Sequence, residues 1–331
     1  MSHKKVKKRR RVRHHVITAF VVILFAIAAL AGVYYCFFSK PAVPVAETKT
    51  PSSSQTQTTA NESTSGRKED FYTVLICGTD DGNGGTDTIM LMGVDVKNGA
   101  INVVSVPRDT LVDVSWNTKK INSTYNNGGI DKLESELEET LGIPVDYYVK
   151  VDLKGFVKLV DKIGGVYFDV PINMDYDDPT QDLHIHVNKG YQKLDGDTAI
   201  GVVRFRHNND GTGYGTEDVG RIETQHAFMS AVAEQTLKVG NLSKIGSFAQ
   251  IFSDYVDSDL SVGNMIWFGK QAVNMGSDNI HFSTLPGDPN GKYMGKYYYI
   301  LDPAETVAMV NETINPYKTD LAVGDMNIIG S

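Results

Sequence analysis

The sequence predicts an α/β protein, a three-layer α/β/α sandwich around a mixed central sheet, preceded by one transmembrane helix. Short β-branched or aromatic runs, bounded by Gly, Asn, Asp or Pro, alternate with segments whose apolar residues recur at helical spacing. The 331 residues are 41% hydrophobic and 22% charged, which excludes a wholly disordered chain or a fibrous repeat.

The transmembrane helix is expected at residues 16–38, a run without a charged side chain. As a helix at about 1.5 Å per residue it is about 35 Å long, enough to cross a bilayer. Residues 1–15 hold eight Lys and Arg and no Asp or Glu, so the positive-inside bias predicts a cytoplasmic tail and a single-pass type II topology. A cleaved signal peptide is the alternative, because small-residue sites occur within residues 26–31. Aromatic residues at 34–38 favour retention.

The charge is distributed unevenly. Eight of the 32 Lys and Arg lie in residues 1–15, which leaves 24 basic against 40 acidic side chains in the rest. A basic tail can also bind nucleic acid, but the membrane topology already explains it, and we expect no nucleic-acid partner. The two cysteines, Cys36 and Cys77, give the external domain no internal disulfide, so its stability must come from core burial.

Residues 39–68 are rich in Pro, Thr, Ser, Gln and Ala and lack periodic apolar positions, which predicts a disordered extracellular linker. Its typical reach is about 30 Å, so the substrate of the domain is expected at or near the lipid surface. No similar stretch recurs, and residues 69–331 are therefore expected to form one extracellular domain.

The order of elements follows from the apolar patterns and from helix caps. We expect a helix that begins at Asp152 and stops at Gly164, and another capped by Asp302 with Pro303 at its first position. Further helices are predicted near residues 130–141, 217–239, 242–257 and 262–276. The predicted strands are residues 74–77, 88–92, 101–106, 147–151, 166–170 and 200–205.

Carboxylates lie at the ends of the first two strands. Asp80 and Asp81 follow the strand at 74–77, and Asp87 stands beyond a Gly- and Asn-rich turn at the start of the next strand. Such carboxylates are placed to share a hard divalent cation. Asp and Asn are also common turn residues, so this fragment alone leaves both interpretations open.

Arginines also follow predicted strands. Arg108 comes after the strand at 101–106, and Arg204 and Arg206 end the strand at 200–205, where a period of two directs both to one face. Two adjacent guanidinium groups repel each other unless an anion lies between them. Open α/β sheets usually build their sites at such strand ends.

Arg221 and Gln225 are four residues apart and share one side of the following helix. The planar fork of a guanidinium matches two phosphate oxygens, so several arginines together indicate more than one phosphate. The alternative for each arginine alone is a surface salt bridge with the abundant Asp and Glu.

From about residue 71 to 230 the chain resembles the LytR-CpsA-Psr family of bacterial membrane-anchored enzymes. The matching residues occur in the order of the family: Gly78-Thr79-Asp80, Asp87-Thr88, Val104-Ser105-Val106-Pro107-Arg108-Asp109-Thr110, Lys120-Ile121-Asn122, Gly128-Gly129, Gly164-Gly165-Val166, Leu194-Asp195-Gly196, Val203-Arg204-Phe205-Arg206-His207 and Asp218-Val219-Gly220-Arg221 with Gln225.

The resemblance implies a phosphotransferase that attaches a glycopolymer, such as teichoic acid or a capsule polysaccharide, from an undecaprenyl-pyrophosphate carrier to the peptidoglycan of a Gram-positive wall. It also implies that Asp80 and Asp87 hold Mg²⁺ on the pyrophosphate. The residues implied to contact the pyrophosphate oxygens are Arg108, Arg204, Arg206, Arg221 and Gln225.

In the implied reaction, a muramic-acid hydroxyl attacks the sugar-linked phosphorus and the lipid phosphate leaves, while the protein positions the groups and neutralises charge. Asp109 and Asp80 are both candidate proton acceptors. Lys120 is a further, weaker candidate for phosphate contact. His207 follows the arginine pair and could contact phosphate, but we expect it to be a solvated loop residue.

Two positions depart from the family pattern, because Gly85 and Thr224 stand where arginines are usual. Their absence could weaken pyrophosphate binding or fit a different polymer or acceptor. The lipid tail should require an apolar tunnel, for which the candidate lining residues are Phe156, Leu159, Val160, Ile163, Phe228, Met229 and Val232.

Two other functions fit the same sequence. A hydrolase would cleave the lipid pyrophosphate with water as the acceptor. A non-catalytic polyprenyl-lipid binder could act as an indirect transcription regulator, since about fifteen cytoplasmic residues are too few for a DNA-reading fold.

Overall fold

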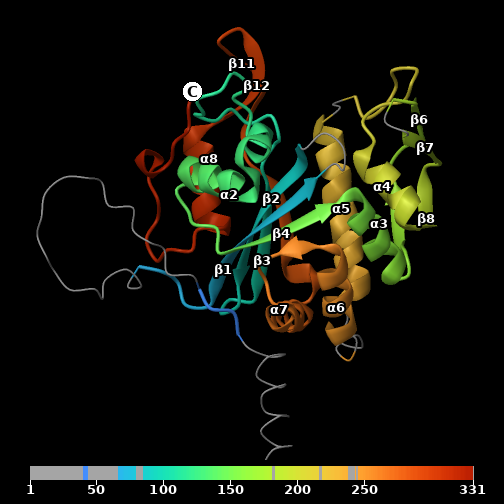
Figure 1. Cartoon of the computed structure of the whole chain (residues 1–331), viewed down its shortest axis with the longest axis horizontal. Coiled ribbons are helices and arrows are strands. Elements are labelled where there is room, and N and C mark those ends of the chain that lie inside the picture. Colours follow the sequence, from blue (N-terminus) through green and yellow to red (C-terminus); the bar gives the residue numbers. More distant parts are fainter. Residues whose placement is uncertain are drawn as a thin grey trace, which may run out of the picture.

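The computed structural model describes residues 40–43, 66–79, 85–180, 183–215, 218–237, 243 and 245–330 (Figure 1). The predicted membrane span at 16–38 and Asp80 both lie outside these ranges. Within them, no helix has the length and apolar character needed to cross a membrane.

A six-stranded mixed sheet forms the centre of the fold, in the order β10-β3-β2-β1-β4-β9. β1 pairs antiparallel with β2 and parallel with β4, and β3 pairs antiparallel with β2 and parallel with β10. The first four predicted strands are confirmed within it. The strands are β1 (Phe71–Thr79), β2 (Thr86–Asp95), β3 (Ala100–Ser105), β4 (Tyr147–Asp152), β9 (Asp257–Ser258) and β10 (Ile280–Thr284).

Helices cover both faces of the sheet (Figure 1). Along β1, Leu75 and Cys77 join a buried cluster with residues of α2 and α8, whereas Tyr72 packs edge-on against Trp267 and Phe268 of α7 on the opposite face. This alternation is the period-two pattern of a strand buried on both sides. The helices on the two faces include α2 (Asn122–Leu141), α5 (Asp218–Thr236), α6 (Ile245–Tyr255), α7 (Val262–Met275) and α8 (Pro303–Thr313).

A second core lies beside the sheet, where two small two-stranded sheets, β5-β8 and β6-β7, pack on α3, α4 and α5 (Figure 1). Phe168, Ile185, Val202 and Phe228 are among its buried members. The predicted strand at 166–170 is therefore present, but it belongs to a separate two-stranded sheet with β8 and not to the central sheet. The elements are α3 (Leu153–Lys162), α4 (Gly196–Arg204), β5 (Val166–Val170), β6 (Met174–Asp178), β7 (Leu183–Val187) and β8 (Gly190–Leu194).

The predicted strand at 200–205 is wrong, because this segment forms most of α4. Asp195 caps the helix by accepting a 2.9 Å hydrogen bond from the Thr198 amide. Ala199, Val202 and Phe205, three residues apart, are all buried in the second core. The cap and this helical spacing override the β-branched composition. Arg204 and Arg206 therefore do not project from a strand.

The helix starts predicted at Asp152 and Asp302 are confirmed, whereas α2, predicted near residue 130, begins at Asn122. The Asp152 side chain caps α3 through the Gly155 amide at 2.6 Å, and the Asp302 side chain caps α8 through the Glu305 amide at 2.8 Å. The patterns did not predict the strands β6 to β10. They also did not predict the remaining short elements, which are β11 (Gly287–Tyr293), β12 (Lys296–Leu301) and the 3₁₀ turns Ser277–Asn279 and Val323–Asp325.

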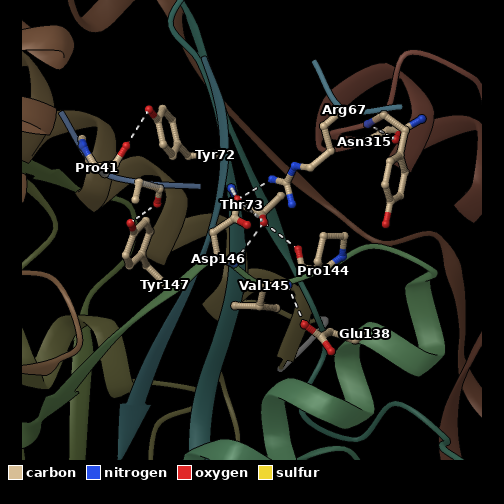
Figure 2. A network of polar contacts seen from close by, with 12 residues as sticks. Pro41, Arg67, Tyr72, Thr73, Glu138, Pro144, Val145, Asp146, Tyr147 and Asn315 are labelled. Atoms are coloured by element: carbon tan, nitrogen blue, oxygen red, sulfur yellow. Dashed lines mark hydrogen bonds and ion pairs between the residues drawn. The ribbon is translucent and has the colours of Figure 1, made fainter. Parts of the chain in front are cut away.

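Parts of the predicted linker contact the domain (Figure 2). Arg67 Nη2 lies 2.6 Å from the buried Asp146 Oδ2, which also accepts a 2.9 Å hydrogen bond from the Thr73 amide. Further upstream, the Pro41 carbonyl accepts a 3.2 Å hydrogen bond from the Tyr72 hydroxyl. Pro41 and Arg67, within the range predicted as a linker, therefore contact the folded domain. The composition of this range does not reveal these contacts.

Candidate functional site

A cavity of about 800 Å³ lies between the β1, β2 and β4 part of the sheet and helices α3 to α7. Most of its lining is apolar, but one end carries charged and amide side chains. The charged, imidazole and amide side chains of the lining are Asp87, Arg108, Asp152, Arg204, Arg206, His207, Arg221 and Gln225.

Four elements bring these side chains together. Asp87 is the second residue of β2, and Arg108 lies three residues beyond the end of β3. Arg204 is the last residue of α4, and Arg206 follows in the next loop. Asp87 and the four arginines therefore line one cavity, with a helix end in place of the expected strand for two of the arginines.

The α5 residues form the inner wall of the polar end. Arg221 is only 6% exposed, and Gln225 Nε2 donates a 2.9 Å hydrogen bond to the Val203 carbonyl of α4. This bond fixes α5 against the helix that ends in Arg204. Both α5 residues line the cavity, as their four-residue spacing predicts.

Ion pairs join the polar loops. Arg108 Nη1 lies 2.5 Å from Asp87 Oδ1, and the Asp87 side chain is 54% exposed. Asp109 Oδ2 lies 2.7 Å from Lys120 Nζ and Asp109 Oδ1 lies 3.9 Å from Arg108 Nε. Asp109 and Lys120 therefore pair with each other beside the site, and neither belongs to the cavity lining.

His207 is half-buried and lines the cavity, which corrects the expectation of a solvated loop residue. Its ring packs edge-on against Tyr176 of β6 at 5.5 Å between centroids. Its Nδ1 lies 3.0 Å from the Asn208 carbonyl, which fixes the ring further. A single loop histidine carries no sequence signal that could predict this packing.

The two positions that depart from the family pattern have different surroundings. Thr224 is buried, and its hydroxyl donates a 2.9 Å hydrogen bond to the Tyr214 hydroxyl. Tyr214 in turn packs edge-on against Phe205 at 5.5 Å. At Gly85, by contrast, a Cβ would meet no heavy atom of the described residues within 4 Å. Position 224 is thus part of the protein packing, whereas no described residue packs against position 85.

All seven residues predicted to line a lipid tunnel line this cavity. Phe156 and Phe228 contact each other in its wall, with 5.8 Å between ring centroids. The prediction missed the contribution of the sheet and of α6 and α7, although the alternating apolar residues of β1 and β2 carried a signal for the sheet side. The missed lining residues include Val74, Ile76, Met90, Phe248, Phe252 and Phe268.

The polar end offers oxygen donors of the type that a hard cation prefers. The Asp87 carboxylate and the side chains of Thr79 and Thr88 belong to the lining. Mg²⁺ is commonly held by one or two carboxylates together with substrate phosphates, so this donor set fits the ion. The second expected ligand, Asp80, lies outside the described residues.

Comparison with known proteins gives consistent relatives. The chain is 28% identical over 272 residues to the polyisoprenyl-teichoic acid–peptidoglycan teichoic acid transferase TagV of Bacillus subtilis (strain 168), covering 78% of this chain and 68% of the relative. It is 29% identical over 303 residues to TagU of Bacillus cereus, a transferase of the same description, covering 88% and 96%.

The fold agrees with these sequence relationships. The crystal structure of B. subtilis TagV superposes with a TM-score of 0.62 at 26% identity, covering 72% of this chain and 94% of that structure. The model of the LytR_cpsA_psr family matches residues 35–315. The chain therefore belongs to the LytR_cpsA_psr family.

Proposed function

We propose that this protein is a phosphotransferase that attaches a glycopolymer from an undecaprenyl-pyrophosphate carrier to peptidoglycan through a phosphodiester bond, with Mg²⁺ as cofactor. The observation that carries the proposal is the two-ended cavity, whose arginine- and carboxylate-lined end continues into an apolar interior. The relatives named as teichoic acid transferases support transfer of a glycopolymer.

The polar end suits the pyrophosphate. Arg204, Arg206 and Arg221 supply three guanidinium groups in a chain that is otherwise acidic outside its N-terminal tail. Each guanidinium can bind two phosphate oxygens in a planar fork. A pyrophosphate with several negative charges therefore matches this end better than a neutral sugar does.

The apolar interior suits the prenyl chain. It lies within one continuous cavity with the arginines, so a lipid in it would present its head group to Arg204 and Arg221. The volume of about 800 Å³ is in the range of ligand pockets, roughly 300–1,000 Å³. The residues around it are mostly leucines, isoleucines, valines, methionines and phenylalanines, which match a hydrocarbon chain.

The proposed step is a nucleophilic displacement at phosphorus. A hydroxyl oxygen of the acceptor sugar bonds to the sugar-linked phosphorus, the bond from that phosphorus to the bridging oxygen breaks, and the prenyl phosphate leaves with the electron pair. The hydroxyl proton passes to a carboxylate, for which the candidates are Asp80 and Asp109. Arg204, Arg206 and Arg221 neutralise the charge on the phosphate oxygens.

A metal ion would be held by Asp87 together with Asp80. When bound, Mg²⁺ would neutralise charge on the pyrophosphate. Arg108 Nη1 lies 2.5 Å from Asp87 Oδ1, so Arg108 would orient this carboxylate and contact the same phosphates. Lys120, paired with Asp109, is assigned only a supporting role at the edge of the site.

We also propose a single-pass type II cell-membrane protein with an extracellular catalytic domain. The uncharged run at 16–38 and the basic residues at 1–15 support this topology. It places the domain beside the lipid-linked donor and on the same side as the wall. Membrane attachment would therefore limit the search for both substrates.

The direct test uses the full chain in lipid vesicles with a lipid-pyrophosphate oligosaccharide, Mg²⁺ and peptidoglycan fragments. The proposal predicts a glycan–peptidoglycan conjugate joined by a phosphodiester. Free sugar phosphate without conjugate would identify a hydrolase. Binding of the lipid without either product would identify a non-catalytic lipid binder.

A further inference from the structure

The β6–β7 hairpin exposes two histidines and two aspartates on one face, away from the cavity described above. Asp175 is paired across the strands with His186, and Asp177 with His184. All four residues are exposed, while the residues between them along both strands are partly or fully buried. The pleat therefore gathers imidazole and carboxylate groups on one side of a two-stranded ribbon.

Three of these side chains have the geometry of metal ligands. Asp177 Oδ1 contacts His184 Nδ1 and lies 3.4 Å from His186 Nε2. One ligand atom from each of the three residues lies within 4.8 Å of the other two. Among the described residues, Asp177, His184 and His186 are the group of three His, Cys, Asp or Glu side chains whose ligand atoms lie this close together.

Asp175 has the position of an orienting partner. Its Oδ1 lies 2.7 Å from His186 Nδ1. Because an ionised carboxylate only accepts hydrogen bonds, a proton on Nδ1 satisfies this contact, and Nε2 is then the ring nitrogen that can bind a metal ion. A carboxylate that fixes the tautomer of a ligating histidine is the usual support of a metal site.

The loop that follows Arg206 holds the hairpin in place. Asn208 Oδ1 accepts a 2.7 Å hydrogen bond from the Asp175 amide, and Asn209 Oδ1 accepts a 2.6 Å hydrogen bond from the Asp177 amide. Both aspartates are therefore fixed at the backbone before any ion binds. Such pre-organisation lowers the ordering cost of binding.

We propose that Asp177, His184 and His186 form a binding site for a divalent transition-metal ion of the zinc type, with Asp175 orienting His186. Two imidazole nitrogens and one carboxylate oxygen are ligands that Zn²⁺ takes in tetrahedral sites, and water would supply the fourth. Mg²⁺ and Ca²⁺ require oxygen ligands and do not match this set. None of the three residues lines the cavity, so this site is separate from the one proposed for Mg²⁺.

The bound ion would join the two strands of the hairpin through side chains of both. It would thereby stabilise a hairpin whose Tyr176 packs on His207 at the polar end of the cavity. The alternative is a set of surface His–Asp ion pairs without an ion, which contribute little to stability. Zinc affinity distinguishes the two.

The first experiment is a calorimetric titration of the full chain with ZnCl₂, and separately with MgCl₂, beside the His184→Gln/His186→Gln variant. His3, His14 and His15 of the N-terminal tail can bind zinc weakly, so the difference between the two chains is the readout. The proposal predicts that the variant loses one zinc site, while His281→Gln, an exposed histidine on β10, keeps it. Equal zinc binding by the wild type and the double variant would overturn the proposal.

Two further measurements locate the ion. Asp175→Asn is expected to weaken the zinc site about 10- to 100-fold, the usual cost of losing an orienting carboxylate. In the wild type, zinc at about ten times its dissociation constant should slow amide hydrogen exchange of β6 and β7 by about tenfold, and MgCl₂ should not. Unchanged exchange in the hairpin at saturating zinc would contradict the assignment.

Discussion

Arg108 Nη1 lies 2.5 Å from Asp87 Oδ1 at the polar end of the cavity. The contact joins the loop after β3 to the start of β2, so a proposed phosphate contact and a proposed metal ligand are adjacent before any substrate binds. Arg108 is 23% exposed and Asp87 54%, so the pair is accessible to a ligand from the cavity. This adjacency links the metal and phosphate parts of the proposed mechanism.

Asp87→Asn is expected to reduce conjugate formation by about 100-fold or more, the scale of losing one preorganised electrostatic group. Because the amide is a weaker ligand, half-maximal activity should require more Mg²⁺. Activity measured across a Mg²⁺ series checks both effects. Asp113→Asn, an exposed aspartate paired with Lys119, is the control. An unchanged Mg²⁺ requirement in Asp87→Asn would remove this residue from the metal site.

Leu159→Trp is expected to obstruct the cavity, because Leu159 lines it from α3. Transfer from a donor with a full-length prenyl chain should fall at least tenfold, while a donor with a short prenyl chain should be used nearly as well as by the wild type. Lys158→Trp adds the same ring to the exposed side of the same helix and should leave both rates unchanged. If both donors suffer equally from Leu159→Trp, the cavity does not hold the chain.

Asp195→Ala is expected to lower the free energy of unfolding by about 1 kcal/mol, because it removes the cap of the helix that ends in Arg204. Hydrogen bonds from the Thr198 side chain and amide lower the pKa of Asp195. Its stabilisation is therefore present above the unfolded pKa of about 3.9 and is lost as the pH falls through the lower folded pKa. Denaturant unfolding at pH 7 and at acidic pH measures the difference. Asp195→Asn retains the cap and should resemble the wild type at pH 7.

Three helices, α3, α4 and α8, show where sequence patterns succeed and where they fail. The caps at Asp152 and Asp302 predicted helix starts correctly, because a cap is a local interaction between neighbouring residues. Residues 200–205 were assigned to a strand on their β-branched composition, but their burial against Phe228 follows helical spacing. Tertiary packing decided this segment, and it is not visible in a six-residue window.

Part of the cavity lining was predictable from the sequence. Residue type and order alone identified Asp87, Arg108 and Arg221 as candidates, and all three line the cavity. The place of His207 was not predictable, because it depends on packing against Tyr176 from a separate hairpin. The roles of Asp109 and Lys120 likewise required the structure, which shows them paired outside the cavity lining.

The stability of the protein should depend on Glu134. Burial, and then the charge of Asp259, raise the pKa of Glu134 to about 7. The folded state therefore binds the proton of the Glu134 carboxyl more tightly than the unfolded chain does, whose glutamate pKa is about 4.3. The contribution of Glu134 to the free energy of unfolding is therefore complete below pH 4 and is lost as the pH rises towards and through 7.

Glu134→Gln is consequently expected to be more stable than the wild type at pH 8 by about 1 kcal/mol, a value discounted for partial solvent exposure. The advantage should shrink towards pH 5. Urea unfolding at the two pH values provides the comparison, with the exposed Glu139→Gln as the control. A difference that is independent of pH would show that the Glu134 carboxyl does not titrate in this range.

Arg67→Ala is expected to lower the free energy of unfolding by about 3 kcal/mol, because Asp146 is 1% exposed and would lose its cationic partner. The hydrogen bonds from Thr73 to Asp146 remain and limit the loss (Figure 2). Arg67→Lys, which keeps the charge, should recover part of it. Thermal unfolding of the three chains measures the order. If all three melt together, the segment at 66–68 does not contribute to the folded domain.

We propose that one cavity holds a prenyl chain and presents its pyrophosphate to Asp87 and the arginines. A crystal structure of the protein with a polyprenyl-pyrophosphate is the decisive measurement. We expect pyrophosphate oxygens within about 3 Å of the guanidinium groups of Arg204, Arg206 and Arg221, with the hydrocarbon between α3, α5 and the sheet. A pyrophosphate bound outside this cavity, with the arginines in contact only with protein groups, would contradict it.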